Sequence, residues 1–341
     1  MVVLAPRRPR VVALLASLLV LATAAPAAAA AHSKPHAKPK PASPNAGIVD
    51  IYTTLGYQNA SAAGTGMIVS SSGEILTNNH VIRGATTFRV VEVSTKKTYT
   101  ATVVGYSVPE DVALLQITPA SGIKTVVKLG VSSRLAVGQT VVARGNAGGR
   151  GGVTVAKGTI TALHQQIVAS DDQGGTETLR NLVETNAGIE AGDSGGPLFN
   201  AAGRVIGMVT AGSTSFRFQN VATRGYAIPI NRARAIVRQI ESGSSTDLVH
   251  VGPTAFFGIT IQDAQGGVLV HDVLGGTAAE AAGLLPGDVI TSLNGVAIGS
   301  SADLQKVVLT LVPGTAVPIE WTDGTGVAQT GEITPASGPP Q

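Results

Sequence analysis

A serine in a glycine-rich turn is the first point in the sequence where residue types indicate chemistry. Ser194 lies in the run Gly192, Asp193, Ser194, Gly195, Gly196. A serine hydroxyl is a weak nucleophile at neutral pH and needs a neighbouring base to accept its proton. The flanking glycines allow a sharp turn that directs the N–H groups of Gly192 and Ser194, with Asp193 between them, at a developing oxyanion. The segment therefore predicts a nucleophile and an oxyanion hole.

A base for this serine is found by elimination among six histidines. Four of them lie in a Pro- and Lys-rich stretch or in and beside a second unit of the chain: His32, His36, His250 and His271. His80 follows an apolar strand that ends in a polar turn, the usual place for a functional side chain at a rim. His164 ends a predicted strand and precedes polar residues, so it is expected to be exposed. His80 is the candidate base, and His164 is the alternative.

The imidazole also needs an acid that holds its tautomer and stabilises the imidazolium. Asp111 opens the apolar run of residues 112–117, where a lone carboxylate is costly unless it is paired. Its neighbour Glu110 competes for the role, but it adjoins Pro109 and is more naturally solvated. The sequence therefore predicts a triad of His80, Asp111 and Ser194.

The elements around these residues read as an all-β protein with few helices. Hydrophobic residues make up 44% of the 341 residues and charged ones 13%, which excludes disorder throughout. Short β-branched runs punctuated by Gly, Ser and Asn predict strands at residues 48–52, 66–69, 88–93, 100–106, 112–117, 140–144 and 153–163. Helical spacing predicts helices at residues 231–242, with Asn231 as the cap, 277–283 and 301–311. The tail of residues 336–341 is expected to be disordered.

The N-terminal segment has the pattern of an export signal. Basic residues, an apolar run and small residues in 1–30 fit a cleaved signal peptide, and an uncleaved membrane anchor over 11–31 is the alternative. Residues 31–46 form a Pro/Lys-rich linker. A domain over 47–245 and a smaller one over 252–337 follow. The protein is thus expected to be secreted or to lie in the cell envelope, outside the cytoplasm.

Charge and cysteine content exclude several classes of function. Six positive charges lie in residues 1–40, which hold no acidic residue, so the net charge of +3 becomes −3 for the rest of the chain. This balance gives no support for nucleic-acid binding. The absence of cysteine excludes disulfides and thiolate catalysis. No metal or nucleotide motif occurs, so no metal site and no cofactor are expected.

The motifs together resemble a known family. The order His80, Asp111, Ser194, in the local sequences TNNHVI, EDVALLQI and GDSGGPL, resembles the trypsin-like serine proteases and, more closely, the HtrA (Deg) family. The resemblance covers essentially residues 47–337. It implies two six-stranded β-barrels with the triad between them, followed by a small β-rich PDZ domain with two helices, and it suggests homotrimers.

The resemblance also implies a specificity pocket, formed by Gly188, Thr210, Ala211 and Gly212. Gly188 stands six residues before the nucleophile, where trypsin-like enzymes that select Lys or Arg have Asp. Without a charge there, burying a basic side chain is costly. Small or medium aliphatic residues such as Val, Ala or Leu are therefore expected at the position before the cleaved bond, although Glu190 lies close by.

The second unit resembles a PDZ domain, which would bind peptide C-termini. Its carboxylate-binding loop is expected at Phe256, Phe257, Gly258 and Ile259, with a side-chain pocket that involves Leu304 and Val308. Such domains add an extended peptide to a sheet edge. A domain that only packs on the barrels or mediates assembly is the alternative.

These features predict a serine endopeptidase of protein quality control that cleaves unfolded or damaged polypeptides. The alternative is a peptide-binding chaperone or adaptor with a silent or ligand-gated protease domain. Two departures from the family pattern bear on control. The loop of residues 145–152 lacks the usual Pro and bulky apolar residue, and position 193 is Asp where many relatives have Asn. No Arg-Ile-Val-Gly-Gly activation site occurs, so ligand-biased loop equilibria are expected in place of zymogen cleavage.

Overall fold

The computed structural model describes residues 43–119, 123, 125–170, 176–212 and 224–341. The expected signal peptide, the alternative anchor and most of the linker lie outside these residues. Among the described residues, no helix is both long and apolar enough to cross a membrane.

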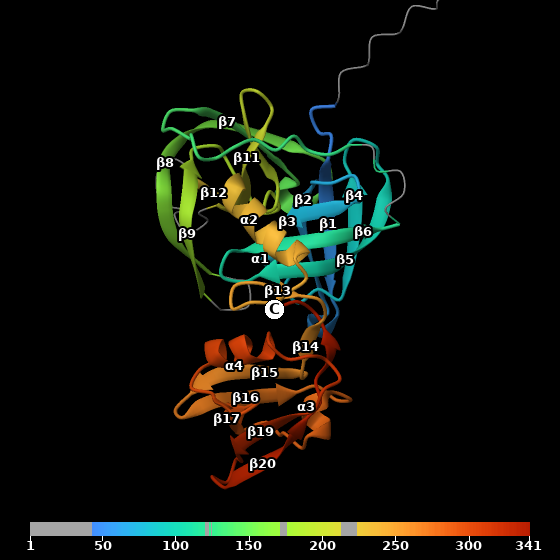
Figure 1. Cartoon of the computed structure of the whole chain (residues 1–341), viewed down its shortest axis with the longest axis vertical. Helices are drawn as coiled ribbons and strands as arrows, with labels where there is room; N and C mark the ends of the chain where they lie inside the picture. The colour runs from blue at the N-terminus through green and yellow to red at the C-terminus, as the bar shows by residue number, and fades with distance from the viewer. Residues whose placement is uncertain (1–42, 120–122, 124, 171–175, 213–223) are drawn as a thin grey trace, which may run out of the picture. The chain divides into compact units, whose positions relative to one another are not determined.

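The first barrel contains six antiparallel strands (Figure 1). Their order is β5-β4-β1-β2-β3-β6, and pairing of β5 with β6 closes the ring. The strands are β1 Ile48–Leu55, β2 Ala60–Ile68, β3 Glu74–Thr77, β4 Thr87–Glu92, β5 Thr98–Ser107 and β6 Val112–Thr118. Short helical turns, η1 Gly56–Gln58 and α1 Asn79–Ile82, join them. The alternation of buried and exposed residues along β4 shows one face turned to the barrel core.

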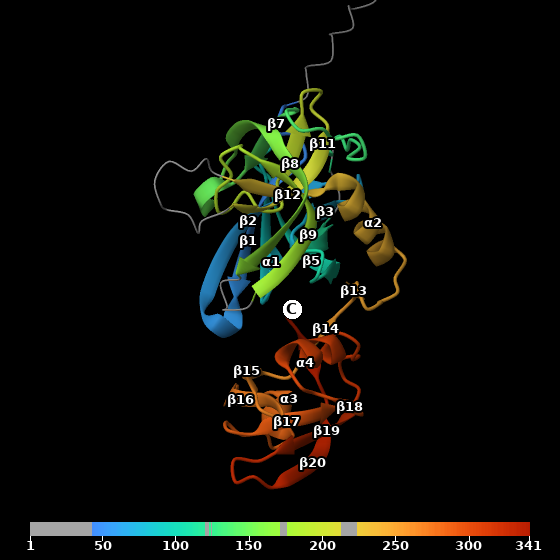
Figure 2. The same cartoon turned by 90° about the vertical axis from the view of Figure 1, so that its left-hand side faces the viewer.

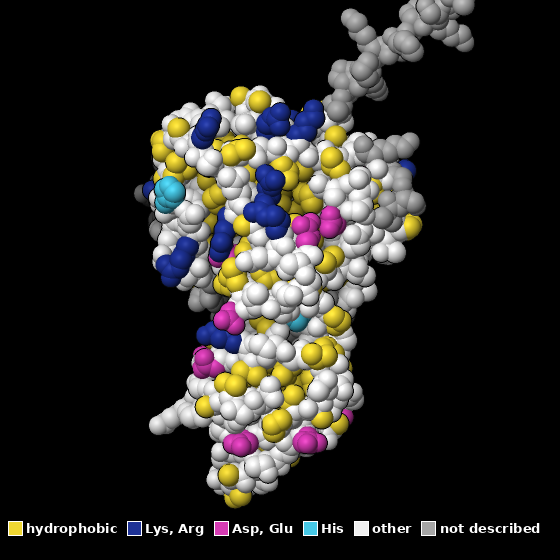
Figure 3. Space-filling view, viewed as in Figure 1, with side chains coloured by type: hydrophobic (Ala, Val, Ile, Leu, Met, Phe, Trp, Pro, Cys, Tyr) yellow, Lys and Arg dark blue, Asp and Glu magenta, His cyan; other side chains and the backbone are white. Residues whose placement is uncertain are grey.

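The second barrel is closed in the order β10-β11-β12-β9-β8-β7. Its strands are β7 Thr140–Gly145, β8 Thr154–Ser170, β9 Thr176–Thr185, β10 Pro197–Asn200, β11 Val205–Gly212 and β12 Gly225–Pro229, with η2 Ala147–Gly149 after β7. The expectation of two six-stranded barrels is therefore confirmed. On the face seen in Figure 3, basic side chains are dispersed among hydrophobic ones instead of forming one stripe.

Helix α2, Ile230–Glu241, follows the second barrel and packs against strands of both, β5 and β6 of the first and β11 and β12 of the second (Figures 1 and 2). Its buried residues recur at helical spacing: Ile230, Ala233, Ile236, Val237 and Ile240. The expected cap was wrong. Asn231 lies inside the helix, where its Oδ1 accepts from Ser132 N at 3.3 Å and its N donates to Ser132 Oγ at 3.0 Å.

Strand β13, His250–Val251, pairs with β5 of the first barrel. The strands that follow it form the smaller domain. The sheet order is β15-β16-β17-β19-β20, with β18 on β17 and a separate β14–β21 pair. The elements are β14 Thr254–Phe256, β15 Ile259–Ala264, β16 Gly267–Val273, β17 Val289–Leu293, β18 Val296–Ala297, β19 Val317–Thr322, β20 Ala328–Ile333 and β21 Ala336–Gly338, with helices α3 Ala278–Ala281 and α4 Ser301–Val308. Ser300 caps α4 by accepting from Asp303 N at 3.2 Å.

Two features of this domain are a buried tryptophan and an ordered C-terminal strand. The ring of Trp321 is buried in its core and lies over Gly331, where an added Cβ would come within 3.3 Å of it. The tail expected to be disordered instead contains β21, which pairs with β14. Its Gly and Pro content suggested disorder, but the open edge of β14 supplies hydrogen-bond partners that the tail's own composition does not reveal.

Candidate active site

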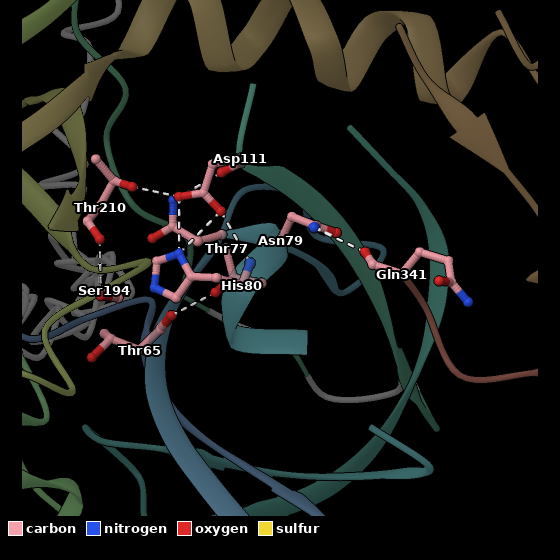
Figure 4. Close-up of polar contacts among 9 residues, drawn as sticks. Thr65, Thr77, Asn79, His80, Asp111, Ser194, Thr210 and Gln341 are labelled. Atoms are coloured by element: carbon pink, nitrogen blue, oxygen red, sulfur yellow. Dashed lines mark hydrogen bonds and ion pairs between the residues drawn. The ribbon is translucent and has the colours of Figure 1, made fainter. Parts of the chain in front are cut away.

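His80 is held at the end of strand β3 by the short helix α1. The next two residues, Val81 and Ile82, are buried and anchor this turn in the first barrel. Asn78, which precedes the helix, donates from Nδ2 to the carbonyl oxygen of Asp111 at 2.9 Å. Asn79 Nδ2 donates to the carbonyl oxygen of Gln341 at 3.0 Å (Figure 4). The imidazole therefore projects from a turn that is fixed on several sides.

Asp111 has a left-handed backbone, with φ of 49°, just before β6, and its side chain is fully buried. Its carboxylate lies 3.0 Å from His80 Nδ1 through each of its two oxygens, and Oδ1 also accepts from His80 N at 3.0 Å. An ionised carboxylate only accepts, so Nδ1 carries the proton and Nε2 is left as the basic nitrogen. This is the orientation that a general base facing a serine needs.

Thr210, in β11, contacts both Asp111 and Ser194 (Figure 4). Its hydroxyl donates to Asp111 Oδ2, and its carbonyl oxygen accepts from Ser194 Oγ at 3.2 Å. Thr210 was expected in the specificity pocket, and the structure places it between the other two groups. It thereby links the strand of the second barrel to the acid of the first.

The turn around Ser194 is built from glycines with positive φ. Gly192 has φ of 98° and Gly195 has φ of 83°. A Cβ at Gly195 would lie 2.0 Å from the carbonyl oxygen of Thr65. Within the described part of the chain, the N–H groups of Gly192 and Ser194 donate no hydrogen bond, whereas Asp193 N donates to the carbonyl oxygen of Glu190 at 3.1 Å. Of the three residues expected at the oxyanion hole, Gly192 and Ser194 thus have available donors.

The carboxylate of Asp193 is buried beneath this turn and bonded locally. Oδ2 accepts from Glu190 N at 3.0 Å, and Oδ1 accepts from Thr154 Oγ1 at 3.2 Å. Burial raises the pKa of Asp193, these two hydrogen bonds oppose that rise, and the charge of Glu190 adds to it. Among the described residues it forms no ion pair. The side chain therefore braces the turn from inside.

The alternatives to the triad residues lie elsewhere. His164 has φ of 56°, is exposed, and places Nδ1 2.5 Å from Asn181 Oδ1. Glu110 points to helix α2, where its carboxylate accepts from Arg232 Nε at 2.7 Å and Nη2 at 2.5 Å. Among the described residues, neither His164 nor Glu110 forms a hydrogen bond with the side chain of Asp111 or Thr210.

The expected specificity pocket is only partly described. Gly188 is exposed, and an added Cβ there would meet no atom of the described residues within 4 Å. Ala211 and Gly212 belong to β11 and pair with Tyr226 and Gly225 of β12. Residues 213–223, which follow them, lie outside the described residues. The aliphatic preference at this pocket stays a prediction.

The residues expected to bind peptide in the second domain either lie in and beside the start of β15 or are buried in the domain core. Phe256 stacks on Tyr57 with ring centroids 4.6 Å apart, and Gly258 has φ of 82°. Ile259 begins β15, which pairs only with β16 among the described strands and so has one open edge. Leu304 and Val308, expected at the side-chain pocket, are largely buried in the domain core, as is Phe257 of the expected loop.

Sequence reasoning did not single out Thr65, and it expected Thr210 in the specificity pocket without foreseeing its contacts with Asp111 and Ser194. Thr65 is fully buried in β2 between Gly64 and Gly66. A hydroxyl in a buried strand requires a partner, so a lone polar residue flanked by glycines was the available signal. Nothing in the local sequence says which partner it finds.

A fold of two six-stranded antiparallel barrels, with a serine, histidine and aspartate grouped as in Figure 4, defines the class of trypsin-like serine peptidases. The chain matches the trypsin-like peptidase domain over residues 64–208 and the PDZ domain over residues 255–324.

Three relatives illustrate the comparison. Serine protease PepD of Mycobacterium tuberculosis is 32% identical over 329 residues, which cover 92% of this chain and 69% of that protein. The periplasmic pH-dependent serine endoprotease DegQ of Escherichia coli is 35% identical over 75% of this chain and 55% of its own length. A structure of the HtrA-type protease AlgW with a tripeptide has 27% identity, covers 87% of this chain and 95% of that one, and gives a TM-score of 0.49.

The chain belongs to the HtrA family of trypsin-like serine proteases with a PDZ domain. It spans 54–69% of the length of the first few curated relatives that it matches.

Proposed function

We propose that this chain is a serine endopeptidase that hydrolyses peptide bonds of polypeptides outside the cytoplasm. The observation that carries the proposal is the contact of His80 Nδ1 with both oxygens of Asp111 at 3.0 Å. This contact leaves Nε2 as the base, and Ser194 Oγ donates to the carbonyl oxygen of Thr210, whose hydroxyl in turn bonds Asp111.

The reaction proceeds through an acyl-enzyme. Ser194 Oγ bonds to the carbonyl carbon of the substrate while its proton passes to His80 Nε2. The negative charge on the former carbonyl oxygen is stabilised by the N–H groups of Gly192 and Ser194. His80 then gives the proton to the leaving amine as the peptide bond breaks. A water molecule repeats the sequence, returns a proton through His80 and releases the acid product.

Labelling with a fluorophosphonate tests this mechanism, since the probe reacts only with an activated serine. We expect the full chain to be labelled, whereas Ser194→Ala and His80→Ala remain unlabelled. Casein unfolded beforehand serves as the substrate in a parallel assay. An adaptor with a silent protease domain would give no Ser194-dependent labelling, with or without an added peptide, and that result would overturn the proposal.

The finer parts of the proposal concern substrate choice and the location of the enzyme. The enzyme is proposed to act on unfolded or damaged proteins in protein quality control, and relatives named as periplasmic endoproteases support its location outside the cytoplasm. A peptide library should show cleavage after Val, Ala or Leu in preference to Arg, because no carboxylate stands at Gly188. Equal cleavage after Arg and Val would contradict this preference.

The PDZ domain is proposed to hold peptide C-termini at the open edge of β15. A peptide with a free C-terminal carboxylate should bind more tightly than the same peptide amidated, because backbone N–H groups of the loop around Gly258 are proposed to hold the carboxylate. Equal affinity for the two forms, measured by calorimetry, would favour a domain that only packs or assembles.

A further inference from the structure

Thr65 lies in the first barrel but makes four hydrogen bonds to described residues at the edge of the candidate active site. Its N donates to the carbonyl oxygen of Ser194 at 2.8 Å, and its own carbonyl oxygen accepts from Thr77 Oγ1 at 2.7 Å (Figure 4). Its hydroxyl donates to the carbonyl oxygen of Gly192 at 2.7 Å and accepts from Asn146 N at 2.9 Å. One hydroxyl therefore joins the turn of the nucleophile to the glycine-rich loop of residues 145–152.

The glycine-rich loop is held at both ends by neighbouring strands of the first barrel. Asn146 N, at its start, donates to Thr65 in β2, and Gly152 N, at its end, donates to Asp50 Oδ2 in β1 at 2.8 Å. Asp50 and Thr65 stand directly opposite each other in the β1–β2 ladder. Asn146 Oδ1 accepts from Gly151 N at 2.7 Å and closes the loop on itself. Thr65 and Asp50 therefore anchor the two ends of this loop on the first barrel.

The loop in turn fixes the peptide that carries one donor of the oxyanion hole. Gly148 N donates to the carbonyl oxygen of Ala191 at 2.7 Å. In a trans peptide the N–H points opposite to the C=O, so this bond sets the direction of the Gly192 N–H. The contact is close, because a Cβ on Gly192 would lie 2.2 Å from the carbonyl oxygen of Asn146. Both peptides that flank Gly192 are thus held through their carbonyls, one by Gly148 and the other by Thr65.

We propose that Thr65 is a positioning residue for the oxyanion hole, acting through the Gly192 peptides and the loop of residues 145–152. The inference rests on the proposed peptidase function. Because an oxyanion forms only in the transition state, loss of the Thr65 hydroxyl should lower kcat and leave KM nearly unchanged.

Three substitutions at Thr65 and one matched control separate this role from ordinary packing. Thr65→Val keeps the size and removes both hydroxyl bonds, whereas Thr65→Ser keeps the hydroxyl. Thr53→Val is the control, since Thr53 is also buried in the first barrel but its hydroxyl donates to Ala62 O at 3.3 Å, away from the turn. Thr65→Cys, with a weak donor of similar size, serves if Thr65→Val does not fold.

The full chain and these variants are compared on a peptide amide substrate and a peptide aldehyde. Ser194 Oγ adds to the aldehyde carbon, and the resulting oxygen occupies the oxyanion position. We expect Thr65→Val to lower kcat about 10- to 100-fold, below the roughly 100- to 1,000-fold loss of a whole donor. KM should stay within about twofold, and aldehyde affinity should fall in parallel with kcat.

Thr65→Ser should retain kcat within about threefold of the original chain, Thr65→Cys should be intermediate, and Thr53→Val should match the original chain. The inference is overturned if Thr65→Val matches Thr53→Val in kcat, if the loss lies in KM, or if Thr65→Ser or Thr65→Cys is no better than Thr65→Val. If the original chain neither labels nor cleaves, the proposed function fails instead, which is a distinguishable outcome.

Discussion

The two barrels contribute to the site by different physical means. The first barrel supplies side chains that are bonded to each other, with His80 on Asp111 and Thr65 on the turn opposite. The second barrel supplies Ser194 on a glycine-dependent turn, because Gly192 and Gly195 give that turn positive φ angles that other residues resist. The contribution of the first barrel therefore depends on side-chain groups, whereas that of the second also depends on backbone conformation. Each barrel should fail in its own way when it is changed.

The largest effect is expected at the acid of the first barrel. Asp111→Asn keeps the shape and tolerates the left-handed backbone, but its amide would donate toward His80 Nδ1 and favour the wrong tautomer. We expect kcat to fall about 10,000-fold with the fold intact, as shown by kinetics together with circular dichroism. A loss of kcat of less than tenfold would show that the side chains of the first barrel do not control catalysis.

In the second barrel, a methyl group should be as damaging as a lost functional group. Gly195→Ala places Cβ 2.0 Å from the carbonyl oxygen of Thr65 and 2.3 Å from Thr77 Oγ1, so the turn has to shift. We expect kcat to fall about 100- to 1,000-fold, as for a lost oxyanion donor. The control is Gly203→Ala, whose φ is 67° but whose Cβ would meet nothing within 4 Å among the described residues.

Gly203→Ala should cost about 1–3 kcal/mol in backbone strain and leave kcat unchanged. Thermal unfolding and steady-state kinetics on both variants make the comparison. Equal kcat values for Gly195→Ala and Gly203→Ala would show that the backbone conformation of the Ser194 turn does not control catalysis.

The pH dependence of stability tests a buried side chain of the first barrel. Burial raises the pKa of Asp50, opposed by the Gly152 hydrogen bond and by Lys96 and Arg89, and its Oδ1 has no partner. The pKa of Asp50 is therefore higher in the folded state than in the unfolded state. Protonated Asp50 stabilises the fold fully below the unfolded pKa, and this stabilisation is lost as pH rises through the folded pKa. Ionised Asp50 is therefore a cost at neutral pH.

Asp50→Asn should thus gain stability relative to the original chain as pH rises from 4 to 7, by at most about 1.4 kcal/mol per pH unit for one proton. Urea unfolding at several pH values measures this difference. Asp323→Asn is the control, because hydrogen bonds from Thr325, Gln329 and Val327 lower the pKa of that exposed carboxyl, so its contribution to stability is lost only at more acidic pH and should be nearly flat from pH 4 to 7. A difference for Asp50→Asn that is flat with pH would contradict the burial argument.

The smallest effect is expected at the ion pair between Glu110, next to the acid, and Arg232 of α2. Their closest atoms are 2.5 Å apart, but the two side chains are 23% and 41% exposed. Solvent screening limits such a pair, so Arg232→Gln should cost less than about 1 kcal/mol and change kcat less than threefold. Unfolding midpoints at low and high salt test this, with exposed Arg234→Gln on the same helix as control. A cost that salt does not reduce would mean that packing, not charge, carries the contact.

The same contrast explains what the sequence could and could not predict. The sequence could single out His80, Asp111 and Ser194 because few residues had the right chemistry, and because His80 and Asp111 adjoin apolar runs while Ser194 lies in a glycine-rich turn. The role of Thr65 was not, because its partners Gly192 and Asn146 are 127 and 81 residues away in the chain. Asn231 has a capping side chain, yet tertiary contact with Ser132 decides its position. In each case a distant partner outweighed the local pattern.

The buried ring of Trp321 has a practical consequence for spectroscopy. It is the one tryptophan of the chain, and it lies in the core of the PDZ domain, whereas the five tyrosines, Tyr52, Tyr57, Tyr99, Tyr106 and Tyr226, all lie in the barrel region. Selective excitation of tryptophan therefore reports the folding of one domain, and tyrosine signals report the other. The unmodified chain carries a separate optical probe for each of its two domains.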